Sequence, residues 1–337
     1  MIQYIHPAQL SRILSDHSGH VLALVDYGKN LKELDRDEGL TMAIDLPQRG
    51  HGQLVEMWTS PHPVSICREK DVAFAFDDDI LLGSIEVSQK PHVSLEQTTL
   101  TVYQNILRSI TNMGYIHLAR MWNYFPLINA EENKQERYQR FCVGRHQAFS
   151  EHREEFQAIL PAASAIGTYG NLFQVYFVAG KIPSAHVENP RQISAYHYPK
   201  LYGTRSPSFA RGTLFTMQNT LYFFVSGTAS IVGHATQHID DPREQTVEAI
   251  LNIQGLVDHA NKELEKEFGQ DFMLDLLKVY VRNIKDTKIV RETLEEHFGM
   301  EQPVLYLEGE MCRKDLLVEI EAIFRSKSQL KCKSGSN

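Results

Sequence analysis

The sequence has no excess of positive charge. Its 337 residues include 34 Lys and Arg against 42 Asp and Glu, which gives a formal net charge of −8 at pH 7. Proteins that bind nucleic acids or anionic membrane surfaces place Lys and Arg against phosphates, and no basic stripe runs along this chain. We therefore expect neither a nucleic-acid partner nor a membrane partner.

Long apolar runs are also missing. No stretch approaches the roughly 20 consecutive apolar residues that cross a bilayer as a helix. The first residues, MIQYIHPAQL, lack the basic segment followed by an apolar segment that is typical of a secretory signal. These features predict a protein of the cytoplasm.

Cysteine is scarce. The four cysteines, Cys67, Cys142, Cys312 and Cys332, lie far apart and form no CxxC pair, so we expect reduced thiols rather than a disulfide framework or a zinc ribbon. The sequence also has no GxGxxG fingerprint and no Walker loop, the motifs that predict a bound nucleotide. We expect no cofactor.

One histidine motif is a candidate for a metal site. His234 and His238 form an HxxxH pattern, and Asp240 and Asp241 follow it. Gly233 before the pattern and Asp-Asp-Pro after it predict a loop rather than a helix. A pocket-lining or hydrogen-bonding role is favoured, and no metal is expected.

What is present indicates a globular protein with strands and helices in alternation. Hydrophobic residues make up 42% of the chain and charged residues 23%, which is ordinary for a globular enzyme. Short alternating runs separated by turn residues predict antiparallel strands before residue 90. A helix is predicted over Leu95–Met113, with Ser94 as its N-cap and Gly114 at its end. The second half repeats this plan, with a helix from about Pro242 to Phe268.

An internal duplication explains this repetition. The triplet Glu-Gln-Thr opens both helices, at residues 96–98 and 244–246, and Asn-Ile follows at 105–106 and 252–253. The fold class predicted is α+β, with two domains of related fold over residues 1–155 and 156–326 and a disordered tail over residues 327–337.

The closing segment, Cys312–Phe324 (CRKDLLVEIEAIF), carries the strongest candidate for chemistry. Hydrophobic residues alternate with Glu319 and Glu321, which predicts a strand with both carboxylates on one face; a helix remains possible. A carboxyl group on the inner face, next to Val318 and Ile320, would be desolvated, which raises its proton affinity and suits a general acid. The alternative is that both glutamates point into water.

The repeat, Ser226-Gly227 before the second helix and the closing VEIEAI resemble the RidA-like imine deaminase family. That resemblance implies two tandem RidA-like domains, each a mixed β-sheet packed on helices, with a cleft that separate subunits form in the family. The family holds its substrate carboxylate with an arginine on the strand before the last one, whereas Gln302–Tyr306 (QPVLY) contains none. This departure disfavours imine deaminase activity, which stays as an alternative.

A more specific resemblance, over roughly residues 110–325, is to the chorismatases, which cleave chorismate into pyruvate and a ring product. The matching segments are Arg120–Ala130 (RMWNYFPLINA), Arg137–Arg145 (RYQRFCVGR), Pro161–Gly167 (PAASAIG), Glu188–Gly203 (ENPRQISAYHYPKLYG), Ser206–Gly212 (SPSFARG), Ser226–Thr236 (SGTASIVGHAT) and the closing CRKDLLVEIE.

Chorismate carries two carboxylates, and a buried dianion requires permanently charged, planar donors, which means arginine. By resemblance the substrate-binding residues are Tyr138, Arg145, Tyr198 and Arg211, with Tyr202, Gln245 and Arg191 as weaker candidates. For each of them a surface ion pair or a core aromatic is the alternative.

The resemblance also implies the reaction. Glu319 matches the family's catalytic glutamate, which protonates the enolpyruvyl methylene carbon. Cys312 matches a position where chorismatases that form an aromatic product have cysteine and hydrolytic ones have an aliphatic residue. We therefore expect pyruvate and 3-hydroxybenzoate, with 4-hydroxybenzoate open as a co-product and a dihydroxycyclohexadienoate as the hydrolytic alternative. A fused double unit predicts a monomer.

Overall fold

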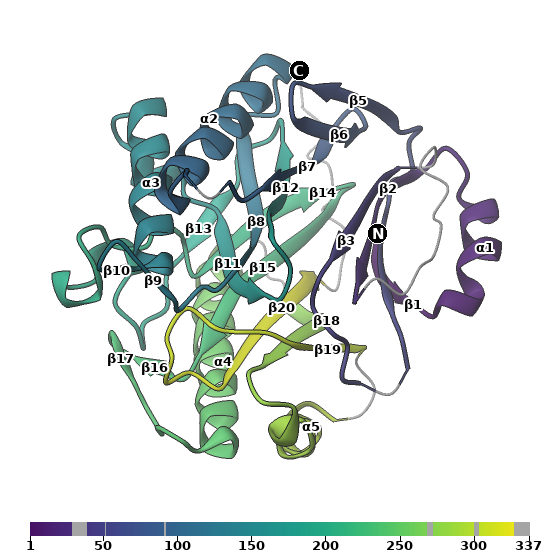
Figure 1. Cartoon of the computed structure of the whole chain (residues 1–337). Helices are drawn as coiled ribbons and strands as arrows, with labels where there is room; N and C mark the ends of the chain where they lie inside the picture. Colours follow the sequence, from purple (N-terminus) through teal and green to yellow (C-terminus); the bar gives the residue numbers. More distant parts are fainter. Residues whose placement is uncertain (29–38, 51, 91, 268–271, 300–302, 327–337) are drawn as a thin grey trace.

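The computed structural model describes residues 1–28, 39–50, 52–90, 92–267, 272–299 and 303–326, and the side chains of 264–267 are excepted. The predicted disordered tail, residues 327–337, and Cys332 lie outside the described residues. The described residues form three larger β-sheets and two short two-stranded ones, and each larger sheet has one or two helices on its outer face (Figure 1).

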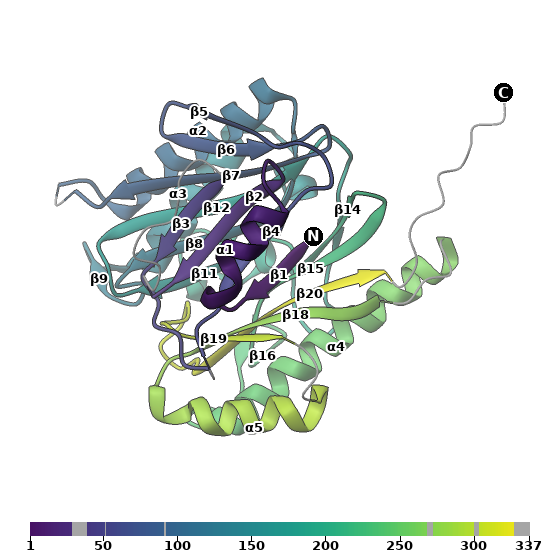
Figure 2. The same ribbon diagram turned by 90° about the vertical axis from the view of Figure 1, so that its right-hand side faces the viewer.

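The N-terminal residues form a small sheet of their own. Its four strands have the order β1-β4-β2-β3, and helix α1 lies against its outer face (Figure 2). The elements are β1 (Ile2–Ile5), α1 (Pro7–Asp16), β2 (Val21–Tyr27), β3 (Leu40–Ile44) and β4 (Val55–Thr59). Every residue of β2 and β4 is buried, because α1 covers one face and the other two sheets cover the opposite face.

A six-stranded sheet follows, with the order β11-β8-β12-β7-β6-β5. Its elements are β5 (Ser65–Glu69), β6 (Val72–Phe76), β7 (Ile80–Ser88), α2 (Leu95–Met113), β8 (His117–Pro126), α3 (Arg137–His152), β11 (Ala162–Thr168) and β12 (Leu172–Gly180), with the short hairpin β9 (Glu131–Glu132) and β10 (Gln135–Glu136) and the turn η1 (Phe156–Ile159) between them. Helix α2 starts and ends as predicted: the Ser94 side chain accepts a hydrogen bond from the Gln97 amide, and Gly114 has φ of 80°.

A second six-stranded sheet has the order β13-β14-β15-β20-β18-β19. Its elements are β13 (Ala185–Val187), β14 (Gly212–Met217), β15 (Thr220–Ala229), α4 (Pro242–Glu267), β18 (Phe272–Val281), α5 (Thr287–Phe298), β19 (Val304–Glu308) and β20 (Val318–Ser326), with η2 (Ala195–His197), η3 (Lys200–Tyr202), β16 (Ile231–Val232), β17 (Ala235–Thr236) and η4 (Ile284–Asp286) as short connections.

The two six-stranded sheets are copies of one plan. Read from β11 or from β19, they share the same strand order and chain direction, and each has one parallel pair, β8 with β11 and β18 with β19. The predicted α+β class and the duplication are confirmed.

The boundary predicted between residues 155 and 156 differs from this arrangement, because β11 and β12 pair with β8 and β7 and complete the first sheet. The chain changes sheet after Gly180.

The inner faces of the three sheets meet in one core. This core combines residues such as Tyr27 and Trp58 of the N-terminal sheet, Trp122 and Tyr176 of the first large sheet, and Tyr280 of the second. Three smaller cores fill the spaces between each sheet and its own helices. Among the described helices, none is both long and apolar enough to cross a membrane.

Candidate active site

A cleft lies where the first large sheet meets the second. Its inner part has a cavity volume of about 40 Å³ and its outer part about 290 Å³. The two parts share six lining residues and therefore belong to one cleft: Tyr138, Pro207, Phe209, Gly227, Cys312 and Glu319. Helix α3, strands β11, β15 and β20, and the segments before β14 and before β20 contribute its walls.

Glu319 reaches this cleft from β20. The segment forms a strand, as predicted, and Glu319 and Glu321 are each 4% exposed, so the alternatives of a helix and of two solvated glutamates are wrong. Space for the Glu319 carboxyl exists because its neighbour on β15 is glycine: a Cβ on Gly227 would lie 1.9 Å from Glu319 Oε1. Burial, and after it the negative charge of Glu321, raises the pKa of Glu319 to about 8, against the opposing charges of Arg120 and Arg282.

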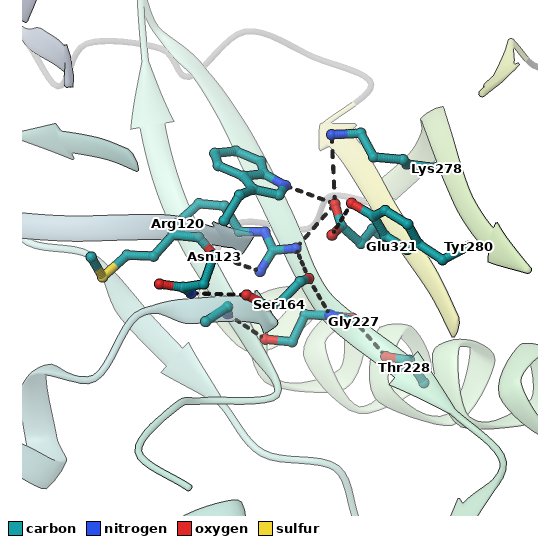
Figure 3. A network of polar contacts seen from close by, with 12 residues as sticks. Arg120, Asn123, Ser164, Gly227, Thr228, Lys278, Tyr280 and Glu321 are labelled. Carbon is teal, nitrogen blue, oxygen red and sulfur yellow. Dashed lines mark hydrogen bonds and ion pairs between the residues drawn. The ribbon is translucent and has the colours of Figure 1, made fainter. Parts of the chain in front are cut away.

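Glu321 lies two residues further on the same face, in a different environment (Figure 3). Its Oε2 accepts a hydrogen bond from Trp122 Nε1 at 2.7 Å and lies 3.2 Å from Arg120 Nη2, and its Oε1 accepts from Tyr280 Oη at 2.9 Å. Burial would raise the pKa of Glu321, but the charges of Arg120 and Lys278 outweigh burial and lower it. The environment of Glu319 thus favours its protonated form and that of Glu321 its ionised form. Such a pair can supply one proton donor and one fixed negative charge.

Arg145, on α3, lines the inner part of the cleft. Its side chain is buried, with 2% of the residue exposed, and it makes no ion pair with a described residue. The guanidinium lies over Tyr103, Phe141 and Phe149, with centroid distances of 5.2, 5.9 and 5.6 Å, and its Nε has no hydrogen-bond partner in the described part of the chain. A buried guanidinium without an ion pair has the charge and the free donors to bind an anionic ligand.

Arg211 and Tyr198 form a second donor pair, in the outer part of the cleft. Arg211 Nη2 donates to Tyr198 Oη at 2.7 Å and to the Ile193 carbonyl at 2.9 Å. Arg211 is 5% exposed, and its Nε also lacks a partner among the described residues. Arg211 thus lines the outer part of the cleft with one donor, Nε, still unused among the described residues.

Tyr202 and Arg313 stand at the outer wall. The Arg313 guanidinium carbon lies 4.0 Å from the Tyr202 ring centroid and 5.5 Å from that of Tyr198. Arg313 was not among the predicted site residues, although it follows Cys312 directly in a matching segment. Its position directly after Cys312 could have suggested that Arg313 lies near the site. That this segment packs against Tyr198 and Tyr202 cannot be predicted from the sequence, because the contact depends on the tertiary fold.

Ser164, on β11, is a second lining residue that sequence reasoning missed. Its Oγ accepts hydrogen bonds from Arg120 Nη2 at 2.5 Å and from the Gly227 amide at 3.0 Å. Ser164 was not among the predicted site residues, although the residues around it form the matching segment Pro161–Gly167. The structure makes them a central part of the cleft wall.

Gln245 and Arg191, two of the weaker candidates, do not line the cleft. Gln245 Nε2 donates to the Asp315 carbonyl at 2.8 Å, and its Oε1 accepts from the Leu317 amide at 2.8 Å, so it anchors the segment that leads into β20. Arg191 forms an ion pair with Glu248 and a hydrogen bond with Asn252 on α4.

Cys312 lines both parts of the cleft. Burial, followed by the charge of Glu319, raises the pKa of the Cys312 thiol to about 12. The thiol therefore stays protonated near neutral pH. It offers the cleft a small apolar surface rather than a nucleophile.

The two histidines of the HxxxH pattern have separate partners. His234 Nδ1 lies 3.0 Å from Tyr202 Oη, and His238 Nε2 lies 3.4 Å from Glu248 Oε2. Within the described ranges, no group of three or more His, Cys, Asp or Glu side chains is placed to hold a metal ion.

Comparisons with known proteins point in one direction. The family model "Chorismatase FkbO/Hyg5-like, N-terminal" matches residues 56–179, which nearly coincide with the first large sheet. A 3-hydroxybenzoate synthase of Streptomyces hygroscopicus is 32% identical over 322 residues, covering 93% of this chain and 94% of that protein. A chorismatase of Streptomyces rapamycinicus is 34% identical over 288 residues, covering 83% and 85%. A chorismatase crystal structure superimposes with a TM-score of 0.84 at 29% identity, covering 96% of this chain and 97% of that one.

Proposed function

The chain belongs to the chorismatase family, and we propose that it cleaves the enolpyruvyl ether of chorismate to give pyruvate and 3-hydroxybenzoate, with Glu319 as the general acid. One observation carries the proposal. A buried carboxyl group with a pKa of about 8 faces a cleft lined by the buried Arg145 and Arg211, whose Nε atoms have no hydrogen-bond partner among the described residues. That combination suits an enzyme that holds an organic dianion and gives it a proton.

The dianion would be held at both ends of the cleft. Arg145, with Tyr138 beside it, would bind one carboxylate in the inner part, and Arg211 with Tyr198 would bind the other in the outer part. Tyr202 and Arg313 would close the outer wall around the second carboxylate. Glu319 borders both parts of the cleft. Once the two carboxylates are bound, one in each part, the enolpyruvyl group would lie against Glu319.

The chemistry follows from the enol ether. Glu319 transfers its proton to the methylene carbon, which becomes the methyl carbon of pyruvate, and positive charge develops on the ether carbon. For the aromatic product, the oxygen of the neighbouring ring hydroxyl attacks the ring carbon that bears the ether, the bond from that carbon to the ether oxygen breaks, and the ether oxygen leaves as the keto oxygen of pyruvate. The hydroxyl proton returns to Glu319, and the resulting ring epoxide isomerises to hydroxybenzoate, so chorismate equals hydroxybenzoate plus pyruvate with no water consumed. The same site with water admitted would give the dihydroxycyclohexadienoate.

We also propose that one chain is sufficient and that it works in the cytoplasm as a monomer. Both walls of the cleft come from the same chain, the first from α3 and β11 and the second from β15 and β20. The cysteines in the described ranges, Cys67, Cys142 and Cys312, are free thiols, as a reducing compartment allows.

The test is incubation of the purified protein with chorismate, with pyruvate quantified and the ring products separated by chromatography. We expect equimolar pyruvate and hydroxybenzoate from the wild type, and a loss of roughly a thousandfold or more in kcat for Glu319→Gln, which keeps the shape of the side chain and removes its proton. Release of ammonia from an imino acid, with no pyruvate from chorismate, would replace the proposal by the imine deaminase alternative. Near-normal turnover by Glu319→Gln would remove Glu319 as the acid.

A further inference from the structure

The glutamate next to the acid is held by an unusual number of donors. Besides Trp122, Tyr280 and Arg120, the Glu321 carboxylate lies 3.8 Å from Lys278 Nζ and receives a hydrogen bond from Ser164. These donors come from β8, β11 and β18, so both large sheets converge on one carboxylate (Figure 3). Glu319, by contrast, faces the cleft and makes no ion pair with a described residue.

Glu321 is one of four buried charges that balance one another. Lys278 Nζ lies 2.8 Å from Glu56 Oε2 on β4, and Glu321 joins this pair to Arg120. We call Glu56, Lys278, Glu321 and Arg120 the ionic tetrad. Each is at most 4% exposed, and with two cations and two anions the tetrad is neutral. Arg120 is the tetrad cation whose charge acts on Glu319, and it is already paired with Glu321.

The pairing of Arg120 decides the state of Glu319. If Glu319 gave up its proton, the adjacent ionised carboxylates of Glu319 and Glu321 would share Arg120, which a low-dielectric interior strongly disfavours. If Glu321 were neutral instead, Arg120 would lack its partner, and an ionised Glu319, on which the charge of Arg120 also acts, would be stabilised. The groups facing Glu319 are Glu321 on β20, Arg120 on β8, Arg282 after β18, Tyr138, Cys142 and Arg145 on α3, and Cys312 and Arg313 before β20.

We propose that Glu321 is a positioning residue: its fixed negative charge, by occupying Arg120 and Lys278, keeps the Glu319 carboxyl in the proton-bearing form that protonates the substrate. The proposal rests on the proposed function for its kinetic consequence, because it assigns Glu321 a part in that same step. It does not require Glu321 to touch the substrate, and Glu321 does not line the cleft.

The test compares Glu321→Gln with two controls. Glu321→Asp keeps the negative charge, and Glu56→Gln removes a different carboxylate of the same tetrad, one that contacts Lys278, Tyr27, Tyr176 and Trp58. In the wild type and both controls, the rate of pyruvate release should fall only as the pH rises through about 8. In Glu321→Gln that fall should occur at least about one pH unit lower.

A readout without substrate separates this inference from the proposed function. The infrared band of the protonated carboxyl group that disappears in Glu319→Gln can be titrated in the free protein. A lower titration midpoint in Glu321→Gln, with an unchanged midpoint in Glu56→Gln, supports the inference even if chorismate is not the substrate. An unchanged midpoint in Glu321→Gln overturns it even if chorismate is cleaved normally.

Glu321→Gln leaves two cations with one carboxylate, so this variant is at risk of misfolding. The double variant Glu321→Gln/Lys278→Gln removes one charge of each sign and keeps the remaining pair neutral. It should show the same downward displacement of the Glu319 midpoint. Retention of the wild-type midpoint in this double variant would also overturn the inference.

Discussion

At the scale of single residues, the position of Glu319 was predictable and its environment was not. Alternation in VEIEAI fixes which side chains share a face of the strand, because the period of a strand is two. The same pattern cannot show that Arg120 and Lys278 hold one of the two glutamates and leave the other without a charged partner. Those side chains lie about 40 to 200 positions away along the chain, and only the packing of two sheets brings them together.

Protonation of Glu319 should make stability depend on pH. The folded pKa of about 8 exceeds the ordinary value of 4.5, so between these values the folded protein keeps a proton that the unfolded chain releases. The free energy of unfolding of the wild type should therefore fall, relative to Glu319→Gln, as the pH rises through this window. Urea denaturation of both proteins near the two ends of the window measures the difference, expected to be a few kcal/mol. A difference that is independent of pH would contradict the assignment.

Cys312→Val should change the product. The thiol is a small, uncharged part of the cleft wall beside Glu319, and valine has the aliphatic character associated with hydrolytic chorismatases. We expect a larger share of dihydroxycyclohexadienoate relative to hydroxybenzoate, measured by chromatography. Cys142→Val is the matched control, because Cys142 is a second buried thiol of the inner part. An unchanged ratio in Cys312→Val would remove Cys312 from product selection.

Arg145→Lys should weaken substrate use although the charge is kept. Lysine lacks the planar fork that binds a carboxylate through two hydrogen bonds. We expect kcat/KM to fall by about tenfold or more. Arg140→Lys is the control on the same helix: Arg140 pairs with Glu96 at 3.3 Å and does not line the cleft. Equal effects in the two variants would argue against carboxylate binding by Arg145.

At the scale of elements, strong local sequence features predicted the ends of a helix correctly. Helix α2 has its N-cap serine and its C-terminal glycine in the predicted places, since both satisfy backbone groups of the helix ends. Strand β11, Ala162–Thr168, falls in the second domain by the predicted boundary, because a local pattern cannot show which sheet a strand joins. It runs parallel to β8 of the first large sheet and contributes Ser164 to the cleft wall.

The irregularity in β15 supplies an element-scale prediction. The pairing with β20 shifts between Val225 and Thr228, and Gly227 in this interval leaves room for the Glu319 carboxyl. Gly227→Ala would force the carboxyl to move, because the added Cβ would overlap Oε1. We expect kcat to fall by about a hundredfold, the scale of a displacement of about 1 Å, with a folded circular-dichroism spectrum.

Gly255→Ala is the control for this substitution. Gly255 lies in α4, and its added Cβ would meet the flexible Arg191 side chain at 3.0 Å, which can move. We expect activity near that of the wild type and equal or slightly higher stability, since alanine favours the helix. If Gly227→Ala were equally well tolerated, the carboxyl would not occupy the place assigned to it.

At the scale of the whole molecule, the duplication could be predicted and the third sheet could not. Two similar units have similar internal patterns, and their helices even begin with the same triplet. Residues 2–59 have no such copy, so nothing in one sequence separates them from the strands that follow. The structure shows that these residues supply part of the shared core and that Glu56 brings the N-terminal sheet into the ionic tetrad.

Lys278 joins all three sheets, and its loss should affect the entire fold. It lies on β18, contacts Glu56 on β4, and also bonds to Tyr176 on β12. Lys278→Met would leave two buried carboxylates short of a cation, and we expect the free energy of unfolding to drop by about 3–5 kcal/mol in urea denaturation.

The matched control is Lys288→Met on α5. The Lys288 side chain is 77% exposed and lies 3.8 Å from Glu292. Exposed pairs contribute little, so a change within about 0.5 kcal/mol is expected. Comparable losses in the two variants would mean that the tetrad contributes no more than a surface pair.

The fusion of two copies into one chain has a consequence for how such a protein can evolve. In an assembly of identical subunits, each substitution is present at every equivalent position at once. Here β12 and β20 occupy equivalent places in their sheets, and each pairs with an equivalent strand: Gln174 lies opposite Tyr124, and Glu319 lies opposite Tyr280. One copy therefore has an amide, bonded to the Ala43 carbonyl, where the other has the acid. Because the two copies are joined in one chain, each can accumulate its own substitutions. One copy can therefore carry the catalytic residue while the other has a structural role.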